Sequence, residues 1–332
     1  MRLSTQLVLT LLMPLGALAA EPVNIAPTPR NTLELHESNP PADTLDRWHD
    51  WLYLHVQDFI ERSDARFVDE GEARLPVPAS PFRLGADYTA IHREAGGVDL
   101  NPRLDLDVLL QMPNLQRRLR LFITSDTVEE SPSPLRSASS SIRAGLRLTP
   151  LRYLDFDVGI RADVPPVAFT SLRWMRRMDL GEWELLPFAK VYLETHKGLG
   201  AAAGFSFDRW MDLWVFRSSS YANWRRDRAD TEWTQAFTLA RAREVIRFGR
   251  YSEVVGGRDL ARGFGIQGLA TGTRDTGTQR YEASVFFKQP TRAHWLYWHV
   301  TPLVTWEKQF GWHPDPGIRI GIDALFWDVS GR

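Results

Sequence analysis

The sequence has no cysteine in 332 residues, and its charges nearly cancel, with 40 Lys and Arg against 41 Asp and Glu. Without cysteine there is no disulfide framework, no thiolate metal site and no lipid anchor on a cysteine. A nucleic-acid-binding protein needs a clearly basic face, so a formal charge of −1 gives no support for a nucleic-acid partner. H-E-x-x-H and EF-hand patterns are also missing, so we expect neither a metal nor a cofactor.

Long hydrophobic runs are scarce as well. The N-terminus, MRLSTQLVLTLLMPLGALAA, combines Arg2, an apolar run from Leu7 to Leu15 and a small-residue pattern that ends at Ala19. These features are typical of a secretory signal peptide, which we expect to cover residues 1–19. Its apolar core is shorter than the roughly 20 residues that a membrane-spanning helix needs. A chain that leaves the cytoplasm without such a helix can span a membrane only as a closed barrel.

From Phe82 onward, apolar and polar residues alternate with the period of a β-strand. Leu104 and Leu106, for example, alternate with Arg103 and Asp105. Strands of about ten residues, separated in turn by short and long connections, predict an all-β, antiparallel, up-and-down transmembrane β-barrel of about fourteen strands. We place this barrel at 82–327 and treat 328–332 as a C-terminal tail. The region 243–261 fits the pattern least well, so about twelve to sixteen strands remain possible.

A soluble β-sandwich would show the same alternation, and two features distinguish it from a barrel in lipid. The second face of the predicted strands is crowded with charge, as Asp155, Asp157 and Arg161 illustrate. Ten of the 13 tryptophans lie near predicted strand ends. Because the indole ring has an apolar body and one N–H group, tryptophan collects where hydrocarbon meets water. Both features favour a barrel with apolar residues outside and charges inside.

The segment between the signal peptide and the barrel divides into three parts. Residues 20–43 are rich in Pro, Asn, Thr and Glu and predict a flexible periplasmic segment. From Thr44, a good N-cap, the spacing of apolar residues predicts an amphipathic helix over 44–71, and a Pro-rich linker follows at 72–81. The stripe of this helix is Leu45, Trp48, Leu52, Val56 and Phe59.

The sequence allows three locations for this helix. It could pack against the periplasmic rim of the barrel, enter the lumen as a plug, or lie on a membrane surface. The face opposite the stripe is acidic, with Asp46, Asp50 and Asp58. Acidic residues argue against binding to an anionic lipid surface. Packing against the rim is therefore the first interpretation.

The last strand resembles the recognition signal that the barrel-assembly machinery reads in outer-membrane proteins. Its pattern is polar, glycine, hydrophobic and aromatic: Arg319, Gly321, Ala324 and Phe326. The chain departs from that signal because it continues with WDVSGR after the aromatic residue. The resemblance implies that the assembly machinery is a partner and that the lipid bilayer of an outer membrane surrounds the barrel.

A wider resemblance covers most of residues 45–327. LGAAAGFSFDRW, AHWLYWHVTPLVTWEKQ and DPGIRIGIDALFW resemble blocks of an uncharacterised family of proteobacterial outer-membrane β-barrel proteins, in which an N-terminal helix precedes the barrel. The resemblance implies this fold and a place in the outer membrane of a Gram-negative bacterium, with the helix in the periplasm. It implies no activity.

Charged residues of both signs are expected inside the barrel in equal numbers. Such a balance favours ion pairs between neighbouring strands over a strongly ion-selective pore. A sharper alternative is an arginine ladder that faces an aspartate ladder across a narrow channel. The residues of this predicted lumen ladder are Arg103, Asp105, Asp107, Arg118, Arg120, Arg143, Arg147, Asp155, Asp157 and Arg161.

Three functions fit a monomeric barrel of this kind. The first is a porin-like channel for small solutes. The second is a non-conducting structural or accessory barrel that binds a partner through its helix or outer loops. The third is a lipid-active enzyme, for which His92 and His196 near the outer strand ends are the candidate bases, although no serine lies close to either in sequence. We expect the first of these and no catalytic residues.

Overall fold

The computed structural model describes residues 44–66, 77, 80, 82–94, 96–110, 112, 119–124, 142–151, 153–246, 259–293 and 295–326. The expected signal peptide, the segment 20–43, most of the linker and the tail 328–332 lie outside this set. The elements are α1 (Thr44–Ala65), β1 (Phe82–His92), β2 (Val98–Leu110), β3 (Leu119–Thr124), β4 (Arg143–Leu151), β5 (Leu154–Arg161), β6 (Val167–Met175), β7 (Met178–Leu180), β8 (Trp183–Glu194), β9 (Gly198–Met211), β10 (Trp214–Arg225), β11 (Arg228–Ile246), β12 (Asp259–Thr273), β13 (Gly277–Pro290), β14 (Leu296–Glu307), the 3₁₀ turn η1 (Lys308–Phe310) and β15 (Pro314–Phe326).

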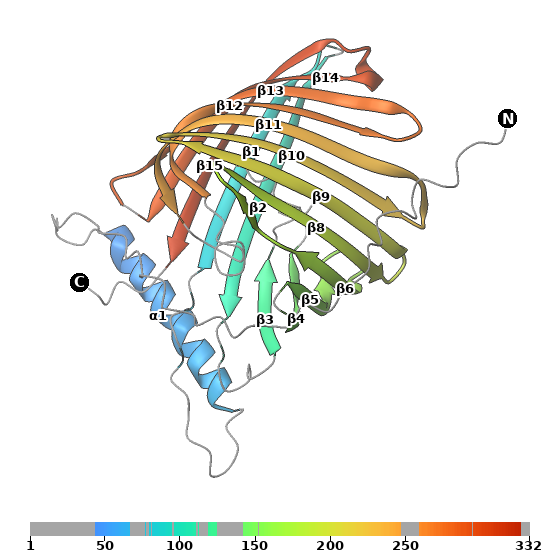
Figure 1. Cartoon of the computed structure of the whole chain (residues 1–332). Coiled ribbons are helices and arrows are strands. Elements are labelled where there is room, and N and C mark those ends of the chain that lie inside the picture. Colours follow the sequence, from blue (N-terminus) through green and yellow to red (C-terminus); the bar gives the residue numbers. More distant parts are fainter. Residues whose placement is uncertain are drawn as a thin grey trace. The chain divides into compact units, whose positions relative to one another are not determined.

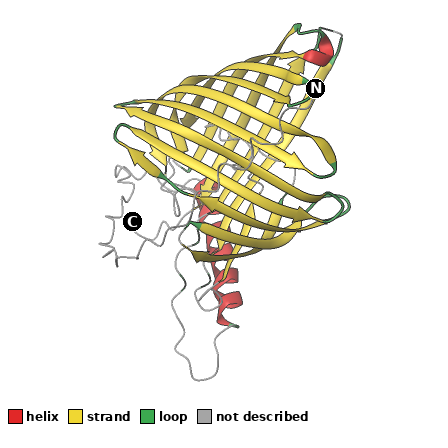
Figure 2. Ribbon diagram, turned by 45° about the vertical axis from the view of Figure 1, so that its right-hand side comes forward, coloured by secondary structure: helices red, strands yellow, loops and turns green. Residues whose placement is uncertain are grey.

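The strands form one antiparallel sheet that returns on itself (Figures 1 and 2). Strands adjacent in sequence are paired, except β6 and β7, which both pair with β8. β1 pairs with β15. β7 continues the register of β6, since Met175 faces Phe188 and Met178 faces Leu185 on β8. If β6 and β7 are counted as one interrupted strand, the fifteen-stranded sheet is a barrel of fourteen strands among the described residues. The predicted fold class is confirmed.

The two faces of the sheet differ sharply in polarity. In the register between β1 and β15, Ala86 faces Ile322 and Tyr88 faces Ile320 on one side. On β2 the same face continues with Leu104, which lies opposite Ala86 and is 73% exposed. On the other face, Asp323 and its neighbours are buried inside the barrel. The apolar residues therefore lie outside and the charged residues inside, which is the reverse of a soluble protein.

Helix α1 packs against the outside of the barrel, at the end where β1 begins and β15 ends (Figure 1). Tyr53 and Ile60 of α1 belong to one buried cluster with Phe82, Val108 and Phe326. These three barrel residues occupy the apolar outer face. No helix in the described part of the chain is long and apolar enough to cross a bilayer.

The helix covers the place where the first and last strands meet. Phe326 at the end of β15 stacks on Phe82 at the start of β1, with ring centroids 4.3 Å apart. The His49 ring stacks on Phe326 at 4.8 Å, and its Nε2 atom lies 3.0 Å from the Leu325 carbonyl oxygen. Asp46 accepts a 2.8 Å hydrogen bond from Trp295 Nε1. Aromatic stacking and two polar contacts thus hold α1 to the seam between β1 and β15.

The predicted helix stripe is divided between two environments. Leu52 and Val56 pack against the cluster at the seam. Leu45, Trp48 and Phe59 are 51%, 47% and 68% exposed. The most deeply buried positions of α1 are instead His49, Tyr53, Ile60 and Asp64, which the apolar pattern did not single out because two of them are polar.

We predict that Ile60→Ala lowers the free energy of unfolding by about 2–5 kcal/mol, because it removes buried methyl groups and leaves a cavity. Leu54→Ala is the matched control: Leu54 is 61% exposed, and the expected change is within about 0.5 kcal/mol. Urea titration of the refolded protein in detergent micelles measures both values. Equal losses in the two variants would contradict the observed packing of α1.

Candidate functional site

The inner face of β1, β2, β13, β14 and β15 carries a column of charged residues, here called the seam wall. Near the helix end of the barrel, Asp323 accepts hydrogen bonds from Arg83 at 2.5 Å and from Lys288 at 2.6 Å. Arg83 also lies 3.6 Å from Asp105. Gly85 opens the space for this group, because a Cβ there would lie 3.0 Å from Asp323 Oδ1 and 3.1 Å from Asp105 Cβ.

A second group of the seam wall lies further along the same strands. The register aligns Asp87, Gly321 and His299 in one row across β1, β15 and β14. His299 Nε2 lies 2.7 Å from Asp87 Oδ1, directly over the glycine. A Cβ at position 321 would overlap Asp87 Oδ1 and lie 2.5 Å from His299 Cε1. The missing side chain of Gly321 is therefore what lets buried His299 and partly buried Asp87, from non-adjacent strands, meet.

A third group of the seam wall brings arginines together. Glu282 accepts a 2.6 Å hydrogen bond from Arg280 and lies 3.5 Å from Arg319. Arg103 of β2 is repelled by the charges of Arg319 and Arg280. Asp87 and Glu282 attract it. The Arg280 side chain is 32% exposed, so water reaches this part of the inner face.

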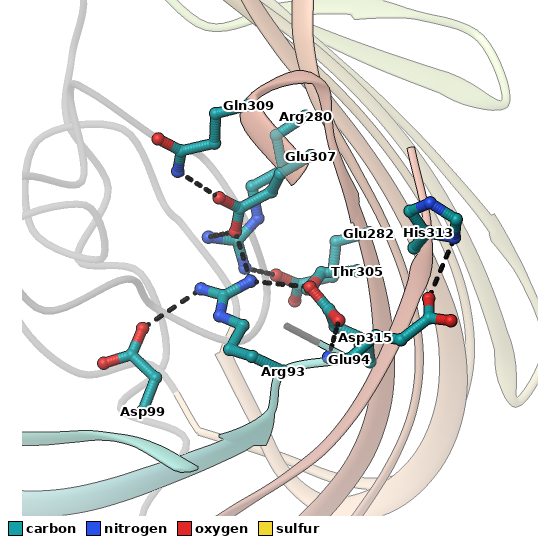
Figure 3. A network of polar contacts seen from close by, with 10 residues as sticks. All are labelled: Arg93, Glu94, Asp99, Arg280, Glu282, Thr305, Glu307, Gln309, His313 and Asp315. Carbon is teal, nitrogen blue, oxygen red and sulfur yellow. Dashed lines mark hydrogen bonds and ion pairs between the residues drawn. The ribbon is translucent and has the colours of Figure 1, made fainter. Parts of the chain in front are cut away.

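The end of the seam wall farthest from α1 holds the network in Figure 3. The guanidinium of Arg93, between β1 and β2, donates to Glu307 at 3.1 Å, to Asp315 at 3.0 Å and to Asp99 at 3.0 Å. Burial lowers the pKa of Arg93, but these hydrogen bonds outweigh burial, so its pKa lies above the usual value. The backbone N–H of Glu94 also donates to Asp315 Oδ1, at 3.0 Å. One arginine thus ties the loop after β1 to β14 and β15.

A second charged region lies on the inner face of β4, β5, β6 and β8. Arg147 donates twice to Asp157, at 2.5 Å each, and lies over the Phe122 ring at 4.9 Å. Arg173 donates to Asp155 at 2.5 Å. These four charged side chains are all nearly inaccessible to solvent. Because a buried charge is stable only when paired, this region is a set of neutralised pairs.

The same region continues to the end of β5. Arg161 donates to both oxygens of Glu194, at 2.7 and 3.0 Å, and to Asp163 at 2.8 Å. Burial raises the pKa of Asp163, but the hydrogen bond from Arg161 and the charge of Lys197 outweigh burial, so its pKa lies below the usual value.

The structure places the predicted lumen ladder in two separate regions. Asp105 joins the seam wall, whereas Arg147, Asp155, Asp157 and Arg161 form the ion pairs of the second region. Three further ladder residues are located by strand pairing. Arg143 of β4 pairs with Arg161 of β5, and Arg120 of β3 pairs with Arg147 of β4. Asp107 of β2 pairs with Arg83 of β1. Arg118 lies outside the described residues.

Sequence reasoning missed Arg83, Asp87 and His299. The first two alternate with Leu84 and Ala86 on β1, so the phase of that strand could have identified them. No sequence pattern links His299 to either, because the strand register creates the contact.

The four residues of the predicted assembly signal divide between the faces of β15. Arg319 and Gly321 belong to the inner seam wall, and the Arg319 Nε atom donates to Thr89 Oγ1 at 3.2 Å. Ala324 and Phe326 lie outside, in the cluster beneath α1. Phe326 is fully buried there.

The expectations about metal binding and lipid hydrolysis concern other residues. In the described part of the chain, no group of three or more His, Asp or Glu side chains could hold a metal ion. His92 and His196, the candidate bases for a lipid-active enzyme, are exposed at the end of β1 and in the turn between β8 and β9.

Comparison with protein-family models and with curated proteins gives no match. Among solved structures, Pseudomonas aeruginosa OpdK with vanillate is 7% identical, with a TM-score of 0.41 over 75% of this chain and 99% of that chain. P. aeruginosa OccK5 (OpdH) is 6% identical, with a TM-score of 0.38 over 75% and 98%. Acinetobacter baumannii OccAB3 is 6% identical, with a TM-score of 0.37 over 75% and 99%. At this level the similarity supports no statement about function.

We predict that Gly321→Ala lowers the free energy of unfolding by about 1–3 kcal/mol, because the added methyl group forces Asp87 and His299 apart. Gly268→Ala is the control, since a Cβ there meets no described atom within 4 Å. The control should keep its stability or gain about 0.4–1 kcal/mol from a less flexible unfolded chain. Urea titration in micelles tests the pair, and equal behaviour would contradict the proposed role of Gly321.

We also predict that Arg147→Ala costs about 3–5 kcal/mol, because it leaves buried carboxylates without their partner. Arg228→Ala removes an exposed ion pair with Glu232 and should cost at most about 1 kcal/mol. Thermal melting followed by circular dichroism compares the two variants. An Arg147→Ala protein as stable as the Arg228→Ala protein would show that the inner pairs contribute little.

Proposed function

We propose that the protein is an outer-membrane channel for small solutes in a Gram-negative bacterium, with α1 on the periplasmic side. The closed sheet supports a place in a bilayer, because lipid offers no partner for free backbone N–H and C=O groups. The exposed outer residues, such as Leu104 and Ile322, suit a hydrocarbon surrounding. The chain is then a monomer that the barrel-assembly machinery inserts.

The observation that carries the channel proposal is the polarity of the seam wall. Arg280 and Arg319 share the carboxylate of Glu282 on the inner face, and their side chains are 32% and 15% exposed. A solute that enters the barrel would meet these donors first at the end away from α1. Charged side chains along a wet inner wall are the means by which barrels select small solutes.

The second charged region favours another candidate function, a structural barrel without a conducting path. Arg147, Asp155 and Arg173 neutralise one another and are shielded from water. Such pairs hold neighbouring strands together and need no solute. In this case α1 or the outer loops would bind a partner protein. Nothing in the described geometry favours the third candidate, a lipid-active enzyme.

Conductance in planar bilayers separates the two functions. We predict that the purified protein conducts ions, and that Arg103→Glu shifts the reversal potential in a salt gradient toward cation preference, because it reverses a charge on the inner wall. Arg62→Glu is the matched control: Arg62 lies on α1 outside the barrel and its side chain is 76% exposed, so selectivity should not change. A wild-type protein that inserts without carrying current would support the structural candidate instead.

A further inference from the structure

Helix α1 has a second apolar face that the barrel does not cover. Leu45, Trp48 and Phe59 are 51%, 47% and 68% exposed although they belong to an apolar stripe. At about 100° per residue, they lie within an arc of about 60° together with Leu52. A contiguous exposed apolar face on one side of a helix indicates a surface that binds another molecule or a membrane.

The uncovered face adjoins the apolar outside of the barrel. The Trp48 ring meets the Phe326 ring edge-on, with centroids 6.0 Å apart. Phe326 ends the row of outer-face residues on β15 that also contains Ile322 and Ile320, which are 51% and 49% exposed. The exposed apolar residues of the barrel wall and those of α1 therefore lie on either side of one buried aromatic ring.

Most acidic residues of α1 lie on the other side of the helix. At about 100° per residue, Asp50 and Glu61 are about 170° from the centre of the Leu45, Trp48 and Phe59 face. Asp58 and Arg62, which form an ion pair, border this face at about 110° and 70° from its centre. An acidic face in this position argues against flat binding to an anionic surface, but it faces water when only the Trp48 and Phe59 side enters the lipid. Tryptophan at such a boundary gains from an apolar ring next to a hydrated headgroup.

We infer that the Leu45, Trp48 and Phe59 face of α1 is a lipid-binding surface that lies in the headgroup region of the leaflet at this end of the barrel. The partner is the bilayer itself, because the face extends the surface by which the barrel meets hydrocarbon. Net acidity of the helix makes zwitterionic lipid the preferred partner. The inference rests on the proposed place of the barrel in a membrane.

Spin labels test the inference, and the absence of cysteine makes every introduced cysteine unique. We predict that a nitroxide at Phe59→Cys, in full-length protein refolded into phosphatidylcholine vesicles, is relaxed more by oxygen than by a water-soluble nickel chelate. Leu54→Cys is the matched control, because Leu54 is equally apolar and 61% exposed but lies on the opposite side of α1. The chelate should relax the label at Leu54 more than oxygen does.

Equal access of the chelate to labels at Phe59 and Leu54 would overturn the inference. A label at Leu104→Cys, on the barrel wall, separates this result from failure of the membrane proposal. If oxygen reaches Leu104 while the chelate reaches Phe59, only the lipid contact of α1 is wrong. If the chelate reaches Leu104 as well, the barrel is not in the bilayer.

Discussion

The antiparallel pairing of β1 with β15 is the contact on which the rest of the structure depends. It runs from Phe82 opposite Phe326 to Ile91 opposite Gly317 and joins segments more than 200 residues apart in the chain. Without it the sheet has two free edges, and free edges cannot exist in hydrocarbon because their N–H and C=O groups have no partners there. Closure also gives the sheet an inner and an outer face. Because successive side chains of a strand point to opposite faces, alternating charged and apolar residues place the charges inside and the apolar residues against lipid.

The position of α1 follows from the same constraint. A closing pair of strands is most exposed at its ends, and Phe82 and Phe326 lie at one of these ends. The rings of His49 and Phe326 and the His49 contact with the Leu325 carbonyl cover that end with aromatic surface and one polar contact. The helix therefore contacts both the first and the last strand. It can stabilise the pairing of β1 with β15 and also cover the apolar surface there.

Inside the barrel, two ways of burying charge coexist. On β4–β6, carboxylates and guanidiniums form compact pairs, as Arg147 and Asp157 do, and a dry wall results. On the seam wall, Gly85 and Gly321 remove side-chain bulk so that charges from several strands share space. The second arrangement brings arginines near one another and leaves Arg280 partly hydrated. A single barrel thus combines a wall that stabilises with a wall that can meet a solute.

The sequence alone determined the class of fold, a strand number near fourteen and the inside-out polarity, because closure in lipid demands a strict period-two pattern that Leu104, Asp105 and Leu106 already display. It also placed charge such as Arg147 and Asp157 on the inner face. Only the tertiary structure decided which charges meet. Asp105 lies beside Arg83 of β1, and His299 reaches Asp87 over Gly321. These partners depend on strand register and on distances across strands, which a local alternation pattern does not contain.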